Sequence, residues 1–111
     1  MEYLDFSKES ILKIYISELD KAEGKPLYEF IMYKAKEFKL SGITIYKGIM
    51  GYGRHFHIHT DKILTLSENL PIIIEIVDEE KRLIEFIQYI KDYIKEGIIS
   101  LEDVRVMRIR D

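Results

Sequence analysis

Cysteine is absent from this chain of 111 residues, so the protein has neither a disulfide framework nor thiolate chemistry. Positive charge is scarce for a nucleic-acid binder, because 17 lysines and arginines are outweighed by 20 acidic residues. The chain also lacks an apolar run approaching the roughly 18 residues of a membrane span. We therefore expect no nucleic-acid partner and no direct insertion into a membrane.

An apolar leader is missing as well. The first ten residues, MEYLDFSKES, contain acids and no apolar core, so they do not resemble a signal peptide, and we expect a cytoplasmic protein. Side-chain amides are nearly absent, with Asn69 and Gln88 the only two, while isoleucine, lysine and glutamate are plentiful. This composition is typical of a thermophile, although an AT-rich genome produces much of the same bias.

What the chain does contain is the periodicity of one small α+β domain, which we place at residues 11–111 after an N-terminal extension, residues 1–10. Alternating apolar residues predict strands at 11–17, 43–50, 72–77 and within 98–109. Apolar residues at helical spacing predict helices at 26–40 and 79–96. This order is typical of a ferredoxin-like βαββαβ sandwich, with a four-stranded antiparallel sheet and two helices on one face.

The predicted strands are apolar on both faces, although right-handed crossovers place both helices on the same face. In the run 72–77 only Glu75 is polar, and the last strand has valines at one parity and Met107 and Ile109 at the other. We therefore expect a partner subunit to cover the second face. The alternative is that residues 1–10 fold over it.

The connection 51–71 is long for a compact domain, which argues for a functional loop or for a wrong assignment of the elements. Three glycines near its start let backbone N–H groups approach an anion closely, and the flanking lysine and arginine could pair with phosphate. These candidate residues are Lys47, Gly48, Gly51, Gly53 and Arg54. A hairpin that needs glycine for its twist is an equally good explanation.

A second group of cations, Arg105, Arg108 and Arg110, lies in and after the final predicted strand. Arginine suits bidentate contact with phosphate or carboxylate, so these residues are further candidates for a ligand site. Ion pairing with acidic residues across an interface explains them equally well.

All three histidines of the chain, His55, His57 and His59, lie in the long connection, and their alternate spacing places them on one face of an extended segment. Neutral imidazoles on one face can bind Zn²⁺, Cu²⁺ or Ni²⁺, and Asp61 continues the same parity. We favour the simpler explanation, a polar face of a β-hairpin arm, because successive residues are too far apart for an easy tetrahedral site.

Catalytic signatures are missing from the sequence. No local Ser–His–Asp or Cys–His context, P-loop or dinucleotide fingerprint occurs. The acidic pair Glu79–Glu80 lies at a predicted helix start, where the helix dipole explains it. We therefore predict that the protein is not an enzyme.

Three stretches resemble a known family: GKPLYEFIMYKAKE, GITIYKGIMGYGRHFHIHTDKILTLSENLPIIIEIVDEEKRL and IISLEDVRVMRI. Together they resemble the domain of unknown function 190 family, part of the PII-like superfamily with nitrogen-regulatory PII and CutA-type proteins, over residues 11–109. The resemblance implies a homotrimer whose inter-subunit clefts bind small molecules, often adenine nucleotides. It further implies that the loop between strands two and three binds a partner protein, with membrane transporters and channels among the possible partners.

From these residues and this resemblance we expect an adenine nucleotide at the base of the long connection, between subunits. Lys47 and Arg54 would come from one subunit and the C-terminal arginines from the next, with Tyr52 stacking on the purine. PII proteins carry a glycine-rich basic loop where this chain reads KEGIISLEDV. The alternatives are a metal-binding or metal-tolerance protein of CutA type that uses the three histidines, and a pure protein–protein adaptor.

Overall fold

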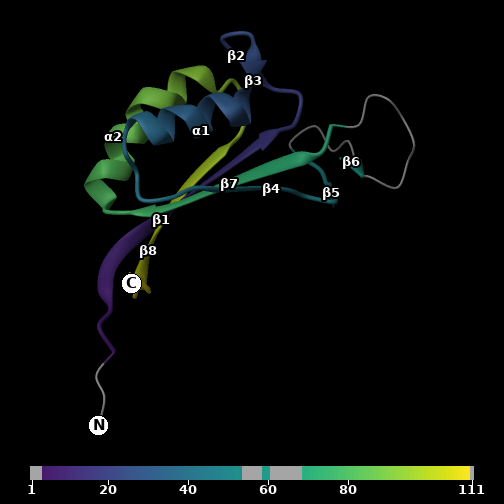
Figure 1. Ribbon diagram of the computed structural model, residues 1–111. Coiled ribbons are helices and arrows are strands. Elements are labelled where there is room, and N and C mark those ends of the chain that lie inside the picture. Colours follow the sequence, from purple (N-terminus) through teal and green to yellow (C-terminus); the bar gives the residue numbers. More distant parts are fainter. Residues whose placement is uncertain (1–3, 54–58, 61–68, 111) are drawn as a thin grey trace.

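The computed structural model describes residues 4–53, 59–60 and 69–110 of the chain (Figure 1). Its elements are, in chain order, β1 (Ser7–Ser17), β2 (Lys21–Ala22), β3 (Lys25–Pro26), α1 (Leu27–Glu37), β4 (Thr44–Lys47), β5 (Met50–Gly51), β6 (His59–Thr60), β7 (Pro71–Asp78), α2 (Glu80–Ile90), the 3₁₀-helix η1 (Lys91–Tyr93) and β8 (Ile98–Val106).

The main sheet has the strand order β4-β7-β1-β8, and all its neighbouring strands are antiparallel. Both helices lie on one side of it (Figure 1), which confirms the predicted α+β, ferredoxin-like βαββαβ architecture. The strand β1 begins at Ser7, so the four residues from Ser7 to Ser10, which we assigned to an extension, pair with β8 as part of the sheet. The short β2–β3 hairpin lies between the first predicted strand and the first predicted helix, where we predicted no strand.

The core lies between the helices and one face of the sheet. Alternation in β1 and β7 directs every second side chain toward the helices, where Leu12, Ile14, Ile74 and Ile76 are almost fully buried. The helices contribute large apolar side chains at helical spacing, among them Leu27, Ile31, Leu83, Phe86 and Ile90. Packing of these two sets stabilises the fold, because buried apolar area is its main favourable free-energy term.

The opposite face, here called the open face, combines apolar and charged side chains. Across it lies a row of four paired residues, Tyr46, Ile73, Tyr15 and Ile98, of which three are more than a third exposed. No helix of the described chain covers this face. Residues 7–10 pair with β8 within the sheet and residues 4–6 continue beyond it, so neither part folds over the open face (Figure 1). An apolar row on an uncovered face favours a protein–protein contact.

A buried carboxylate joins the ends of both helices to the sheet. Asp78, the last residue of β7, is 4% exposed and accepts hydrogen bonds from the amides of Ser41 (2.8 Å) and Glu79 (2.7 Å). It also pairs with the guanidinium of Arg82 at 2.9 Å. The other Arg82 amino group donates to the carbonyls of Phe38 and Lys39, where α1 ends. One residue therefore fixes the end of α1 and the start of α2 together.

Two opposing effects act on the pKa of Asp78. Burial raises it, but the hydrogen bonds from Glu79 and Ser41 and the charge of Arg82 outweigh burial and hold the pKa below its ordinary value. The ionised form is thus the one that the fold stabilises, and acid should remove that stabilisation.

We expect Asp78→Asn to lower the free energy of unfolding at pH 7 by about 2–3 kcal/mol, because it leaves Arg82 without its buried counter-charge. This contribution is complete above the unfolded-state pKa of about 3.9 and disappears as the pH falls through the lower folded-state pKa. Urea unfolding of both proteins between pH 3 and pH 7 measures the difference, which should shrink toward acid. Asp103→Asn, at an exposed ion pair with Lys8, is the control and should change stability by under about 0.5 kcal/mol. Equal losses would contradict the prediction.

Candidate functional site

The long connection between β4 and β7 starts at an ion pair. Lys47, the last residue of β4, places its Nζ 2.6 Å from Oε1 of Glu18, which follows the end of β1. The hydrogen bond from Lys47 lowers the pKa of Glu18, and the same bond raises the pKa of Lys47. The predicted phosphate-binding lysine therefore already has an anionic partner within its own chain.

Glu18 also holds the other end of the connection. Its backbone N–H donates to the carbonyl of Leu70 at 2.9 Å, and its Oε2 accepts from the Leu70 amide at 3.4 Å. The next amide, that of Leu19, donates to Oδ1 of Asn69 at 3.2 Å. We call Glu18, Lys47, Asn69 and Leu70 the loop-base cluster, since they bring the start and the end of the connection together.

The glycines near the start of the connection pack closely against Pro71. The Gly48 amide donates to the Pro71 carbonyl at 2.8 Å, and a Cβ at Gly48 would lie 2.7 Å from Cγ of Pro71. At Gly51 the corresponding distance is 3.2 Å, and at Gly53 no atom lies within 4 Å. Close packing is thus a sufficient reason for glycine at the first two positions, without an anion.

The hairpin expected in this region is present. Met50 and Gly51 of β5 pair with Thr60 and His59 of β6. Tyr52, the expected stacking residue, follows β5 and is 65% exposed. Arg54, His55, His57 and Asp61 lie outside the described residues, so the metal site that we considered stays a prediction. Within the described part of the chain, no group of three His, Cys, Asp or Glu side chains could hold a metal ion.

The C-terminal arginines lie far from Lys47 within one chain. Arg105 of β8 is paired with Lys8 of β1, whereas Lys47 lies in the same row of the sheet as Ile16 of β1. Lys8 and Ile16 are eight residues apart along β1, so Arg105 and Lys47 are separated by about 27 Å along the strand direction. Arg108 forms an ion pair with Glu9, and the Arg105 guanidinium lies 5.3 Å from the centre of the Phe6 ring. Arg110 follows β8 and is exposed. A single subunit therefore does not bring the two groups of cations together.

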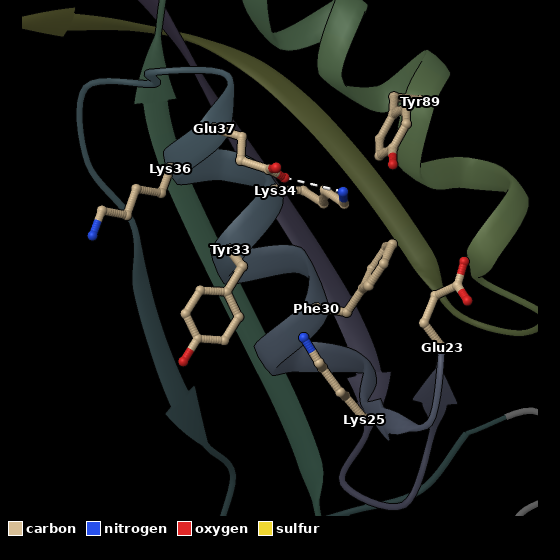
Figure 2. A pocket seen from close by; sticks show the side chains of 8 residues that line it. All are labelled: Glu23, Lys25, Phe30, Tyr33, Lys34, Lys36, Glu37 and Tyr89. Atoms are coloured by element: carbon tan, nitrogen blue, oxygen red, sulfur yellow. Dashed lines mark ion pairs between the residues drawn. The ribbon is translucent and has the colours of Figure 1, made fainter.

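A hollow of about 570 Å³, which we did not predict, lies on the helix side (Figure 2). It lies between α1, α2 and the β2–β3 hairpin and is lined by Glu23, Lys25, Phe30, Tyr33, Lys34, Lys36, Glu37 and Tyr89. Lys34 pairs with Glu37 at 3.0 Å, and its Nζ lies about 5.5 Å from two ring centres. None of the expected ligand residues lines this hollow.

The helices of the described chain are all too short or too polar to cross a membrane.

A family profile decides the relationship of the chain to known proteins. The profile of the DUF190 family, described as "Uncharacterized ACR", matches residues 9–106. The chain belongs to the DUF190 family. This membership confirms the resemblance drawn from its three sequence stretches.

Curated relatives in the DUF190 family span nearly the same length. A UPF0166 protein of Aquifex aeolicus is 40% identical over 90% of this chain and 94% of its own. A UPF0166 protein of Methanocaldococcus jannaschii is 43% identical over 91% of this chain and 94% of its own. Neither name states a reaction or a ligand.

Solved structures show that the DUF190 fold is PII-like. CPII, a nitrogen regulatory PII-like protein of Thiomonas intermedia bound to ADP, AMP and bicarbonate, is 21% identical and covers 96% of this chain and 94% of its own, with a TM-score of 0.67. A PII-like signalling protein of Thermus thermophilus is 18% identical over 94% of both chains, with a TM-score of 0.68. CutA1 of Oryza sativa is more distant, 12% identical over 92% of this chain and 84% of its own, with a TM-score of 0.54.

We expect Gly48→Ala to lower the free energy of unfolding by about 1–3 kcal/mol, because its methyl group would overlap the ring of Pro71. Gly42→Ala is the matched control, since a Cβ at Gly42 meets no atom within 4 Å. Thermal unfolding of both variants and the wild type measures the effect. A Gly48→Ala protein as stable as the control would show that Pro71 does not impose glycine here.

Proposed function

We propose that the protein is a PII-like regulator that binds an adenine nucleotide in clefts between the subunits of a homotrimer. The observation that carries this proposal is the match of almost the whole fold to CPII, whose structure holds ADP, AMP and bicarbonate. The lysine at the loop base gives such an anion a charged partner at the start of the long connection. In this proposal the protein binds the nucleotide as a regulatory signal and does not convert it.

The open face supports the trimer. Its row Tyr46, Ile73, Tyr15 and Ile98 is apolar and uncovered in the described chain, and the Tyr46 hydroxyl is hydrogen-bonded to Glu75 beside it. That hydrogen bond raises the pKa of Tyr46 further above the ordinary pH range, in which a tyrosine hydroxyl is already neutral. An oligomer that buries this row removes apolar area from water without burying an unpaired phenolate.

The separation of the two cation groups supports a site shared by subunits. Lys47 lies at one end of the sheet and Arg105 at the other, so only different copies could bring them to one ligand. In the proposed cleft, Lys47, Arg54 and the amides of Gly51 and Gly53 come from one subunit, whereas the amide of Gly48 is already bonded to Pro71 and lies beside the site. The neighbour contributes Arg105, Arg108 or Arg110, and Tyr52 stacks on the purine.

The long connection is the segment through which we propose that ligand binding affects a partner protein. It starts and ends at the loop-base cluster, so a ligand at Lys47 contacts the segment that connects β5 to β7. In this proposal the occupied site changes that segment, which then recognises a partner protein, a membrane transporter or channel. A protein that binds no small molecule would act as an adaptor through the same segment.

The trimer is tested by sedimentation equilibrium at micromolar concentration, with an expected mass three times 13.2 kDa. Ile73→Lys places a charge in the middle of the apolar row and should shift the mass toward the monomer. Lys8→Glu, outside that row, should leave the mass unchanged. A monomeric wild type would overturn the proposed assembly.

Nucleotide binding is tested by calorimetry with AMP, ADP, ATP, cyclic nucleotides, bicarbonate, Zn²⁺ and Cu²⁺. We expect ADP or ATP to bind and Lys47→Ala to weaken that binding about 10-fold, the usual effect of losing one charge-assisted hydrogen bond. Lys34→Ala is the control, because Lys34 also has an acidic partner but lies in the hollow on the helix side. Metal binding lost on replacing the three histidines would favour the CutA alternative, and silence with every compound would leave only an adaptor.

A further inference from the structure

One carboxylate in the loop-base cluster contacts both Lys47 and Leu70. Glu18 Oε1 lies 2.6 Å from Lys47 Nζ, and Oε2 accepts from the Leu70 amide. The Glu18 side chain is 26% exposed and that of Lys47 50%, so both can be reached from solvent. The carboxylate thus takes the position next to Lys47 where an anionic group of a ligand would bind.

We infer that Glu18 is an internal competitor of the anionic ligand, and that a phosphate group binds Lys47 by displacing this carboxylate. The inference rests on the proposed function, because it concerns the same site. It assigns to Glu18 a role that neither the sequence pattern nor the proposed ligand contacts require.

Charge balance explains why displacement is needed. A carboxylate at 2.6 Å cancels most of the field of one ammonium group, so a second anion that approaches the intact pair gains little. An anion that replaces the carboxylate gains the full charge-assisted hydrogen bond, but the exposed ion pair must first break. An exposed ion pair of this kind weakens the binding of an anion that must displace it about two- to fivefold.

Displacement of the Glu18 carboxylate also changes a hydrogen bond at Leu70, where the long connection ends. When its carboxylate leaves Lys47, Glu18 no longer holds the Leu70 amide, whereas the backbone bond from Glu18 N–H to the Leu70 carbonyl can remain. Ligand binding near Gly48 then loosens one bond at Leu70. Because linkage is reciprocal, whatever loosens the Leu70 bond must strengthen ligand binding by the same factor.

The experiment compares wild type, Glu18→Gln and Glu37→Gln as full-length oligomers, with ADP as the ligand. Glutamine keeps the size of the side chain and removes its charge. Calorimetry should show ADP binding two- to fivefold tighter, roughly, to Glu18→Gln than to wild type. Glu37→Gln is the matched control, because it breaks a comparable pair with Lys34 on the helix side and should leave ADP binding unchanged.

Amide hydrogen exchange at Leu70, followed by NMR, supplies the second readout. We expect ADP to speed exchange at Leu70 in the wild type, and Glu18→Gln to exchange fast with or without ADP. Glu18→Ala should behave in the same way, which guards against a glutamine that still accepts from Lys47.

The outcomes separate the two proposals. If ADP binds wild type and Glu18→Gln equally, or binds Glu18→Gln more weakly, the competitor role of Glu18 is wrong and the proposed function stands. If ADP and inorganic pyrophosphate bind neither protein, the proposed nucleotide site is wrong and the competitor role fails with it.

Discussion

A buried carboxylate at the end of β7 holds the two layers of this protein in register. Asp78 accepts from the amides of Ser41 and Glu79, and its partner Arg82 caps the carbonyls with which α1 ends. The core between the helices and the sheet is built from apolar side chains, whose packing is non-directional. The charged hydrogen bonds at Asp78 supply the direction, since they fix where α1 ends and where α2 begins.

The strand and helix periods were sufficient to predict the fold, because burial on the helix side is strictly alternating in β1 and β7. The first residues of β1 escaped prediction for a physical reason. Lys8 and Glu9 pair with β8 beyond the helices, where no core requires apolar side chains, so the sequence there lacks alternation. Prediction also joined β4 and β5 into one strand. In the structure β4 ends at Lys47, and the next residue, Gly48, packs against Pro71.

The candidate site could be predicted only in part. Lys47 was selected as a candidate because a cation beside glycines is a recognisable local pattern, and its role stays a prediction. Its partner Glu18 was not found, because the two residues are 29 positions apart and meet only where strand ends come together in space. The same limit applies to Arg108, whose pair with Glu9 spans 99 positions. Patterns of neighbouring residues in the sequence indicate which kind of ligand a site could bind. Which of its charges are already paired depends on contacts between residues far apart in the sequence.

That charge balance connects the open face to the loop base. Both use side chains of β4: Tyr46 points to the open face and pairs with Glu75, while the next residue, Lys47, points to the other side and pairs with Glu18. Any subunit that packs on the open face therefore contacts β4, the strand that carries Lys47, the proposed ligand-binding lysine. Tyr46 on the open face and Lys47 on the opposite face are separated by a single peptide unit. In the proposed trimer we therefore expect assembly and nucleotide binding to be coupled, with Glu18 beside the proposed ligand and Glu75 at the proposed subunit contact.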